Sequence, residues 1–305
     1  MSVVLFGYHN MGCIALNVLQ ELDIPVPAVF THQDDPGENR WFDSLPEKSR
    51  QAEIPVFFPE DLHAPKWLNL VRELAPDILL SCYFRHMIRE EMLAIPRLAA
   101  VNLHGSLLPR YRGRCPVNWQ LIHGEREAGV TLHHMVRRAD AGDIVGQRSV
   151  PIEEKDSALT LFRKLEPAAK DLLREAIPRL LDGTAPRIPQ DHSRASYFGG
   201  RRPEDGRIHW NWPCRRIYNL IRAVTKPYPG AFTFLGRRKL MIWWAEPLDE
   251  EEAGVAAGTV LAREPEWLVQ TGQGLLRLVE VGEADQSASE TLPVSQLLRP
   301  GDRLS

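Results

Sequence analysis

The chain has 305 residues, of which 44% are hydrophobic and 25% are charged, and its formal net charge is -3. This length exceeds what one hydrophobic core usually holds, so two domains of an ordinary globular protein are expected. The slightly acidic balance argues against a surface built to bind nucleic acid. Four scattered cysteines without a Cys-x-x-Cys pair argue against a zinc site or a disulfide framework. No secretory signal and no run of roughly 20 apolar residues is found, so we expect a cytoplasmic protein without a membrane span.

The first part of the chain alternates between apolar stretches of strand length and amphipathic stretches of helical length. Strands are predicted at residues 3–6, 26–31, 77–81 and 98–104, and helices at residues 11–22, 61–74 and 86–95. This alternation predicts an α/β fold, a doubly wound and mainly parallel sheet of the Rossmann-like type with helices on both faces. Residues 129–136 and part of 143–152 alternate with a period of two, and a long amphipathic helix over 159–181 would close this domain.

Residues 183–206 are rich in Pro, Gly, Arg and Asp, a composition typical of a linker. The sequence then changes in character: a helix is predicted around residues 215–224, and short strands such as 239–244 and 258–261 follow. Short strands separated by Gly turns favour a small β-barrel. We therefore expect a catalytic domain over residues 1–185, a linker over 186–206 and a smaller second domain over 207–305.

The segment that begins at Asn102 combines polar side chains in a way that points to chemistry. Asn102 and His104 are two residues apart at the end of a predicted strand, so both side chains project from the same face. A loop rich in Gly, Pro and Arg follows, and α/β proteins usually place their active sites where strands end in such loops. Asp140, in a second loop with Gly142, supplies a carboxylate that can stabilise a protonated imidazole. An amide, an imidazole and a carboxylate are therefore expected to meet around one small reacting group.

The pattern Asn-x-His-x-Ser-Leu-Leu-Pro over residues 102–109, with Tyr-Arg-Gly at 111–113 and with Asp140, resembles the active site of the formyltransferases that use 10-formyltetrahydrofolate. The resemblance extends over nearly the whole chain. Some segments resemble in particular the formyltransferase domain of the ArnA-type bifunctional polymyxin-resistance proteins: residues 6–13, 30–32, 35–38, 138–142, 222–224 and 229–232. In this family a Rossmann-like catalytic domain is followed by an OB-like β-barrel, which is the implied architecture here.

The resemblance implies that Asn102, His104 and Asp140 are catalytic. Moving a formyl group from a folate nitrogen to an amine creates a tetrahedral carbon with a developing oxyanion, which donors such as the Asn102 amide and the His104 ring would stabilise. His104 would also carry a proton from the attacking amine to the departing nitrogen. None of these steps needs a metal, so no metal site is expected.

The resemblance also implies where the two substrates bind. Two loops would hold the folate co-substrate through His86, Met87, Ile88, Arg114, Val136, Arg137, Arg138, Ala139 and Asp140. The turn after the first strand would line the nucleotide-sugar pocket with Tyr8, His9, Asn10 and Met11. This turn is neither Gly-x-Gly-x-x-Gly nor a P-loop, so a tight turn between strand and helix is the alternative interpretation.

Two further polar groups have more than one interpretation. Arg110, Arg112 and Arg114 form either a solvated basic loop or a contact for the folate or a diphosphate. His133 and His134 are adjacent in a predicted strand and face opposite sides, so they cannot easily share a metal ion. We interpret both histidines as structural.

The expected reaction is transfer of a formyl group from 10-formyltetrahydrofolate to the 4-amino group of UDP-4-amino-4-deoxy-L-arabinose, in the lipid A modification that gives polymyxin resistance. The alternatives are a methionyl-tRNA formyltransferase, which needs a basic surface for tRNA, and another nucleotide-sugar N-formyltransferase. Methionyl-tRNA formyltransferases typically carry Ala-Ala-Pro where this chain has Arg114, Cys115 and Pro116, which speaks against the first alternative. A dehydrogenase domain could follow at the C-terminus of the full-length protein, as it does in the ArnA-type proteins.

Overall fold

The computed structural model describes residues 1–34, 40–249, 252–263, 265–284 and 291–305. Residues 35–38, part of the resemblance given above, therefore lie outside the described residues. The chain divides into two compact units. The first consists of Met1–Pro116, Glu127–Pro151 and Phe162–Phe198, and the second of Val117–Arg126, Ile152–Leu161 and Gly199–Ser305. The domain boundaries expected from the sequence, with a linker over residues 186–206, stay a prediction.

The first unit is built on a seven-stranded sheet with the order β3-β2-β1-β4-β5-β7-β8. Its strands are β1 (Val3–Gly7), β2 (Val29–Phe30), β3 (Val56–Phe57), β4 (Ile78–Cys82), β5 (Ala99–His104), β7 (Glu127–His134) and β8 (Ile144–Pro151). The first five in spatial order are parallel, whereas β7 runs antiparallel to β5 and β8 antiparallel to β7. The chain order reverses between β1 and β4, and open α/β sheets bind ligands outside the carboxyl ends of their strands at such a switch point.

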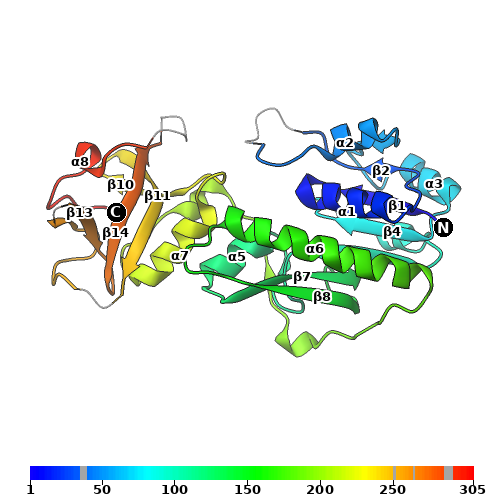
Figure 1. The fold of residues 1–305 in the computed structure, drawn as a ribbon. Helices are drawn as coiled ribbons and strands as arrows, with labels where there is room; N and C mark the ends of the chain where they lie inside the picture. The colour runs from blue at the N-terminus through cyan, green and yellow to red at the C-terminus, as the bar shows by residue number, and fades with distance from the viewer. Residues whose placement is uncertain (35–39, 250–251, 264, 285–290) are drawn as a thin grey trace. The chain divides into compact units, whose positions relative to one another are not determined.

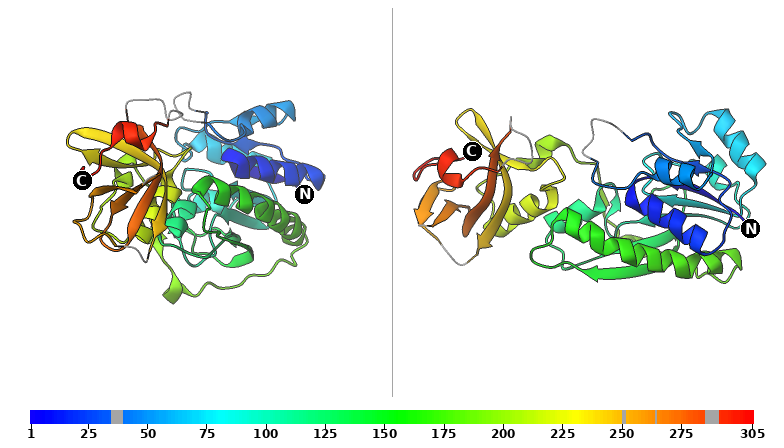
Figure 2. Two further views of the ribbon diagram at one scale, coloured as in Figure 1. Left: turned by 60° about the vertical axis from the view of Figure 1, so that its left-hand side comes forward. Right: turned by 45° about the horizontal axis from the view of Figure 1, so that its top comes forward.

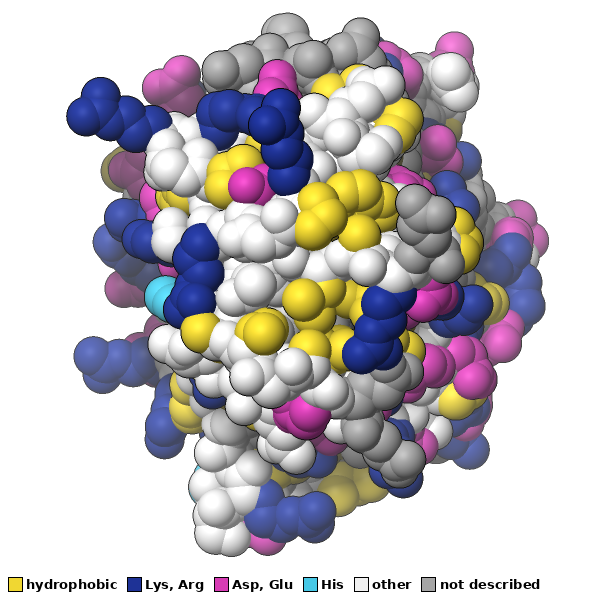
Figure 3. All heavy atoms as spheres, turned by 90° about the vertical axis from the view of Figure 1, so that its left-hand side faces the viewer, with side chains coloured by type: hydrophobic (Ala, Val, Ile, Leu, Met, Phe, Trp, Pro, Cys, Tyr) yellow, Lys and Arg dark blue, Asp and Glu magenta, His cyan; other side chains and the backbone are white. Residues whose placement is uncertain are grey.

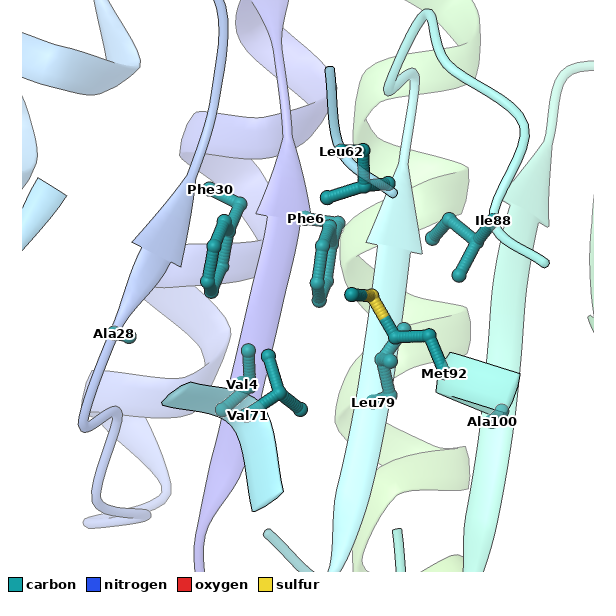
Figure 4. Close-up of a cluster of buried hydrophobic side chains, with 10 residues drawn as sticks. All are labelled: Val4, Phe6, Ala28, Phe30, Leu62, Val71, Leu79, Ile88, Met92 and Ala100. Atoms are coloured by element: carbon teal, nitrogen blue, oxygen red, sulfur yellow. The ribbon is translucent and has the colours of Figure 1, made fainter. Parts of the chain in front are cut away.

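Helices cover both faces of this sheet, which confirms the predicted doubly wound α/β fold (Figure 1). They are α1 (His9–Glu21), α2 (Leu45–Gln51), α3 (Pro65–Leu74), α4 (Glu90–Leu93) and α6 (Ala158–Leu181). In Figure 4, α1 and α6 lie behind the strands, and the side chains of a buried apolar cluster lie in front: Val4, Phe6, Ala28, Phe30, Leu62, Val71, Leu79, Ile88, Met92 and Ala100. Val3 and Leu5 are also fully buried and alternate with Val4 and Phe6 along β1. Because both faces are covered, β1 is apolar without interruption.

The second unit contains α7 (Cys214–Val224), α8 (Val294–Leu297), most of α5 (Pro116–Ile122) and a five-stranded antiparallel sheet. The strands are β10 (Ala231–Leu235), β11 (Arg238–Leu248), β12 (Val260–Arg263), β13 (Glu266–Gln270) and β14 (Leu275–Glu283), in the order β10-β11-β14-β13-β12. Ser305 exchanges two backbone hydrogen bonds with Phe234 on β10, and Leu304 donates to Gly258 just before β12. The C-terminal residues thus bridge the two edges of the sheet, as in a small barrel. Figure 2 gives two further views of these strands and of the red C-terminal segment.

Some elements differ from their predicted extent for physical reasons. The helix expected over residues 86–95 is confined to α4, because Ile88 reaches the core from irregular backbone while Met92 reaches it from the helix. Residues 186–206 contain two short 3₁₀ turns, η1 (His192–Arg194) and η2 (Pro203–Gly206), and the strand β9 (Tyr197–Phe198). Strand β9 pairs in parallel with β6 (Arg112–Gly113), so this segment is folded against the loop that follows Asn102 and His104. None of the helices in the described ranges combines the length and the apolar character that a membrane span requires.

Candidate active site

Asn102 lies on β5, and its paired residue on β7 is His133. Directly opposed residues of antiparallel strands present their side chains on one face, and here Nδ2 of Asn102 lies 3.2 Å from Nε2 of His133. Nδ1 of His133 donates to the carbonyl oxygen of His134 at 2.8 Å. A carbonyl only accepts, so the proton of a neutral His133 ring sits on Nδ1 and Nε2 accepts from the Asn102 amide.

His104 is the last residue of β5, and it is buried. Its Nε2 donates to the carbonyl oxygen of Tyr111 at 2.7 Å, and its Nδ1 lies 3.7 Å from Oδ2 of Asp140. Because Nε2 holds its proton against a carbonyl, Nδ1 is the nitrogen that can gain or release one. The loop that brings Tyr111 back onto the ring is fixed by the Thr131 hydroxyl, which donates to the carbonyl oxygen of Ser106 at 2.6 Å. The strand end and this loop together set the orientation of the imidazole.

The loop between β7 and β8 carries Asp140 back to the end of β5. The φ angle of Asp140 is 54°, in the left-handed region that residues other than glycine seldom adopt. Gly142 lets the loop run close to β7, because a Cβ at this position would lie 2.0 Å from the carbonyl oxygen of His134. The backbone N–H of His134 donates to the carbonyl oxygen of Asp143 at 2.8 Å and closes the loop. The position of Asp140 therefore depends on a glycine and on irregular backbone contacts.

The Asp140 carboxylate is the charged centre of the site. Oδ2 accepts the backbone N–H of Gly113 at 2.8 Å, and Oδ1 lies 3.4 Å from Nε2 of His133 and 3.5 Å from Nδ2 of Asn102. Burial by itself would raise the pKa of Asp140, but the charge that His104 can carry, the contact with His133 and the Gly113 N–H together hold this pKa below its usual range. Asp140 therefore stays ionised at neutral pH and can stabilise a positive charge on either imidazole.

The structure brings together Asn102, His104 and Asp140, which the sequence selected, and adds His133, which the sequence did not assign to the site. The sequence alone favours a structural role for His133, because two adjacent histidines on a strand cannot easily share one metal ion. The signal that could have found it is the alternation along β7, which puts one of the two histidines on the face of Asn102. His134 is the residue on the opposite face, and burial lowers its pKa.

The residues predicted to hold the folate differ in exposure. Met87 and Val136 are apolar and yet 56% and 45% exposed, whereas Ile88 is 7% exposed and packs in the core cluster. A ligand at Ile88 would thus meet its backbone. The remaining members are exposed or half-buried: His86, Arg114, Arg137, Arg138 and Ala139. The role of this set in folate binding stays a prediction.

Most side chains of the turn predicted to line the sugar pocket are held inside the protein. Met11 is fully buried, and Tyr8 is 3% exposed. The Asn10 amide is used internally, since Nδ2 donates to Oε1 of Glu166 at 2.5 Å and Oδ1 accepts the backbone N–H of Asp43 at 2.8 Å. A ligand at this turn would therefore contact its backbone or the remaining side chain, that of His9.

His9 lies in an aromatic cluster. Its ring centroid is 4.0 Å from that of Phe42, 4.5 Å from that of Trp41 and 4.7 Å from that of Phe162. Burial, with a smaller contribution from the charge of Arg85, lowers the pKa of His9 to about 3. The ring is therefore neutral at physiological pH.

The three arginines that follow the motif have different environments. Arg110 and Arg114 are exposed, whereas Arg112 is fully buried. Its guanidinium donates to the side chains of Gln190, Tyr197 and His192. Arg112 therefore fits neither interpretation given above, a solvated basic loop or a contact for the folate or a diphosphate, because its side chain lies inside the first unit.

Within the described ranges, no three or more His, Cys, Asp or Glu side chains are grouped so that they could hold a metal ion. The nearest approximation is the site itself, where two imidazoles and one carboxylate are used in hydrogen bonds with each other and with the backbone. That the chemistry proceeds without a metal stays a prediction.

This fold and this site agree with the family to which the sequence matches. The model of the formyl transferase domain matches residues 5–177, and that of the formyl transferase C-terminal domain matches residues 201–297. The chain therefore belongs to the formyl transferase family, and both domains of the family are present. The resemblance noted from residues 102–109 and Asp140 is confirmed at the level of this family.

Solved structures share the fold over nearly the whole chain. An N-formyltransferase from Helicobacter canadensis, in complex with folinic acid and dTDP-3-aminofucose, is 22% identical with a TM-score of 0.73, covering 92% of this chain and 100% of that chain. WlaRD, a sugar 3N-formyl transferase solved with dTDP and 5-N-formyl-THF, is 18% identical with a TM-score of 0.71, covering 94% and 99%. HypX from Aquifex aeolicus, in complex with tetrahydrofolic acid, is 19% identical with a TM-score of 0.60, covering 97% of this chain and 46% of that chain. At these identities the likeness establishes a common fold.

Proposed function

We propose that this chain transfers the formyl group of 10-formyltetrahydrofolate to the amino group of a nucleotide-linked amino sugar. The observation that carries the proposal is the convergence of Asn102, His104 and Asp140 at the carboxyl end of β5, with Oδ2 of Asp140 3.7 Å from Nδ1 of His104. The family membership gives the reaction class, and the site supplies the groups that this class requires. A cytoplasmic location is part of the proposal.

In the proposed reaction the amine lone pair forms the new C–N bond, and the bond between the formyl carbon and the folate nitrogen breaks. His104 accepts the amine proton at Nδ1, since its Nε2 is held by the carbonyl oxygen of Tyr111, and returns that proton to the departing nitrogen. Asp140 stabilises the imidazolium while the proton resides there. The two amide hydrogens of Asn102 face Nε2 of His133 at 3.2 Å and Oδ1 of Asp140 at 3.5 Å. In the proposed reaction the hydrogen of the longer contact, the one to Asp140, turns to the developing oxyanion.

The folate is proposed to lie along residues 86–88 and 136–140. Met87 and Val136 expose apolar surface close in sequence to the site, which a pteridine ring could cover. The backbone around the buried Ile88 can serve a pteridine ring by hydrogen bonds. The exposed Arg114 and Arg137 can meet the negative charges of the folate tail.

For the acceptor we propose UDP-4-amino-4-deoxy-L-arabinose, with a role in lipid A modification and polymyxin resistance. The resemblance of residues 6–13 and 138–142 to the ArnA-type proteins supports this choice, and a dehydrogenase domain beyond this chain belongs to the same proposal. A second candidate is a dTDP-linked amino sugar, favoured by the structures solved with dTDP-3-aminofucose and with dTDP. Formyl transfer to tRNA is disfavoured by the net charge of -3, and on the face in Figure 3 the Lys and Arg side chains are interspersed with acidic and hydrophobic ones.

Parallel assays of formyl transfer test this proposal. The purified chain is supplied with 10-formyltetrahydrofolate and with UDP-4-amino-4-deoxy-L-arabinose, dTDP-3-aminofucose or initiator methionyl-tRNA, each with and without a chelator. We expect the highest kcat/KM with the UDP sugar and no effect of the chelator. Higher kcat/KM with the dTDP sugar would select the second candidate. Transfer to tRNA alone, transfer to no acceptor, or loss of transfer with the chelator would contradict the proposal.

A further inference from the structure

Residues 190–198, part of the stretch that the sequence suggests as a linker, contact the segments that hold His104 and Asp140. Strand β9 pairs with β6, and the ring of Phe198 stacks on that of Tyr111 with centroids 5.1 Å apart. Ser196 holds the same tyrosine, since its hydroxyl accepts the Tyr111 N–H at 2.9 Å. The carbonyl oxygen of Tyr111 is the group that accepts from Nε2 of His104. The segment therefore supports the residue that orients the imidazole.

Gln190 in the same segment holds the loop of Asp140. It is 6% exposed, and its Nε2 donates to the carbonyl oxygens of Asp140 at 2.9 Å and of Gly142 at 2.6 Å. Its Oε1 accepts from Nε and one terminal nitrogen of Arg112, at 3.2 and 2.5 Å. One amide thus ties the backbone on both sides of residue 141 to the buried arginine.

Arg112 completes the connection. Its guanidinium also donates to the Tyr197 hydroxyl at 2.7 Å and to Nδ1 of His192 at 3.0 Å, both in the segment that contains Gln190. The next residue, Gly113, donates its N–H to the Asp140 carboxylate. Among the described residues these hydrogen bonds surround the buried charge, together with the ring of Tyr197, whose centroid lies 5.3 Å from Cζ of Arg112. Loss of one such bond to a buried charge costs stability. The network is therefore stiff.

We propose that Gln190 is a positioning residue for formyl transfer, and that residues 190–198 form a strap that holds Asp140 and His104 in register. This inference rests on the proposed function. Because the φ of Asp140 is left-handed, its loop needs outside support to keep the carboxylate 3.7 Å from the imidazole. Small displacements of groups that act on a reacting centre reduce rates strongly, so we expect the strap to act on kcat and not on the affinity for the amino sugar.

Two variants of Gln190 and one control separate positioning from stability. Gln190→Leu removes both the donors and the acceptor, whereas Gln190→Glu keeps an acceptor for Arg112 and places an oxygen against the carbonyls of Asp140 and Gly142. Ser193→Ala is the control, because this exposed side chain bonds only to Asp191 in the same turn of the described structure. We expect kcat to fall about 10- to 100-fold in both Gln190 variants with KM for the amino sugar within threefold, and no change in Ser193→Ala. Unchanged kcat in both Gln190 variants, or a rise in KM alone, would overturn the inference.

Hydrogen exchange gives a readout that does not depend on activity. In the wild-type chain, the amide of Gly113 is protected by the Asp140 carboxylate, and in Gln190→Glu we expect at least tenfold faster exchange there and in residues 138–143. Exchange in α1 and β1 should stay unchanged, which excludes global unfolding as the cause. Equal exchange rates at Gly113 and in residues 138–143 of the wild type and of Gln190→Glu would reject the strap, even if the chain transfers formyl groups. Absence of transfer by the wild-type chain would instead reject the proposed function and leave the exchange result interpretable.

Discussion

Asn102 and His104 are held by regular structure, whereas Asp140 is held by a loop. Strand β5 is paired on both sides, with β4 in parallel and with β7 in antiparallel register, so backbone hydrogen bonds to two neighbouring strands fix it along its length. Asp140 has a left-handed backbone and depends on single contacts from Gly113, Gln190 and its own loop. The strand provides redundant support, and the loop does not. Perturbations outside the site are therefore expected to reach Asp140 before they reach the other two residues.

The largest effect is expected from removing the imidazole on the strand. His104→Gln keeps a side chain that can donate to the carbonyl oxygen of Tyr111 but cannot take up a proton at the position of Nδ1. We expect kcat to fall about 10²- to 10⁴-fold, with the thermal midpoint almost unchanged, because the strand needs no help from this side chain. Steady-state kinetics and a thermal melt measure the two quantities.

A matched histidine provides the control for this prediction. His134 is also buried, but its side chain lies on the other face of β7 from His133 and Asn102. His134→Gln should leave kcat within threefold. If His104→Gln retains a kcat within threefold of the wild type, His104 has no part in the proton transfer.

Steric pressure on the loop should give the next largest effect. In Gly142→Ala the new methyl group would lie 2.0 Å from the carbonyl oxygen of His134, so the loop must move away from β7. We expect kcat to fall about 10- to 100-fold and the free energy of unfolding to fall by about 1–3 kcal/mol. Gly199→Ala is the control, since a methyl group there would meet no atom within 4 Å. Equal kcat values in the two variants would show that the loop tolerates displacement and would remove the contrast with the strand.

The same contrast explains what the sequence could predict. The apolar stretches at residues 3–6, 77–81 and 98–104 revealed the sheet, and the two-residue spacing of Asn102 and His104 placed both on one face, because regular structure repeats its pattern in the sequence. The support of Asp140 has no such period. Gln190 lies 50 residues away in a stretch that looks like a linker, and only the folded backbone brings it to Asp140. The burial of Arg112 was missed for the same reason, since a run of arginines normally indicates a solvated loop.

His133 links the strand to the loop, and its two nitrogens can be tested separately. Asn places its amide nitrogen near the position of Nδ1 and keeps the bond to the carbonyl oxygen of His134. Gln places its amide group near the position of Nε2, where Oε1 can accept from Asn102 and Nε2 can donate to Asp140. We expect kcat to fall about tenfold in His133→Asn and less than threefold in His133→Gln, because the unpaired amide and carboxylate in the former lose about 1 kcal/mol or more of hydrogen bonding. The reverse order would assign His133 a role in folding rather than in the site.

The smallest effect concerns stability against pH and tests whether the loop keeps Asp140 charged. The folded-state pKa of Asp140 lies below its unfolded value of about 3.9, since the positive charge that His104 can carry, the contact with His133 and the Gly113 N–H outweigh burial. A depressed pKa contributes stability that is fully present above pH 3.9 and is lost as pH falls toward the folded pKa. The part of the difference in unfolding free energy between wild type and Asp140→Asn that comes from ionisation of Asp140 should therefore be constant from pH 7 to pH 5.

Below pH 5 the wild type should lose stability relative to Asp140→Asn, by about 1 kcal/mol at pH 3. Each pH unit below the unfolded pKa of Asp140 removes at most about 1.4 kcal/mol of the stability that the ionised carboxylate contributes. Urea unfolding at each pH measures this difference in unfolding free energy. Asp143→Asn is the control, because Asp143 is a neighbouring carboxylate that pairs with the exposed Arg187. A difference that grows at low pH would mean that the pKa of Asp140 is raised, as burial alone would make it. The loop would then hold a neutral acid rather than a carboxylate, and the stabilisation of an imidazolium at His104 would have to come from another group.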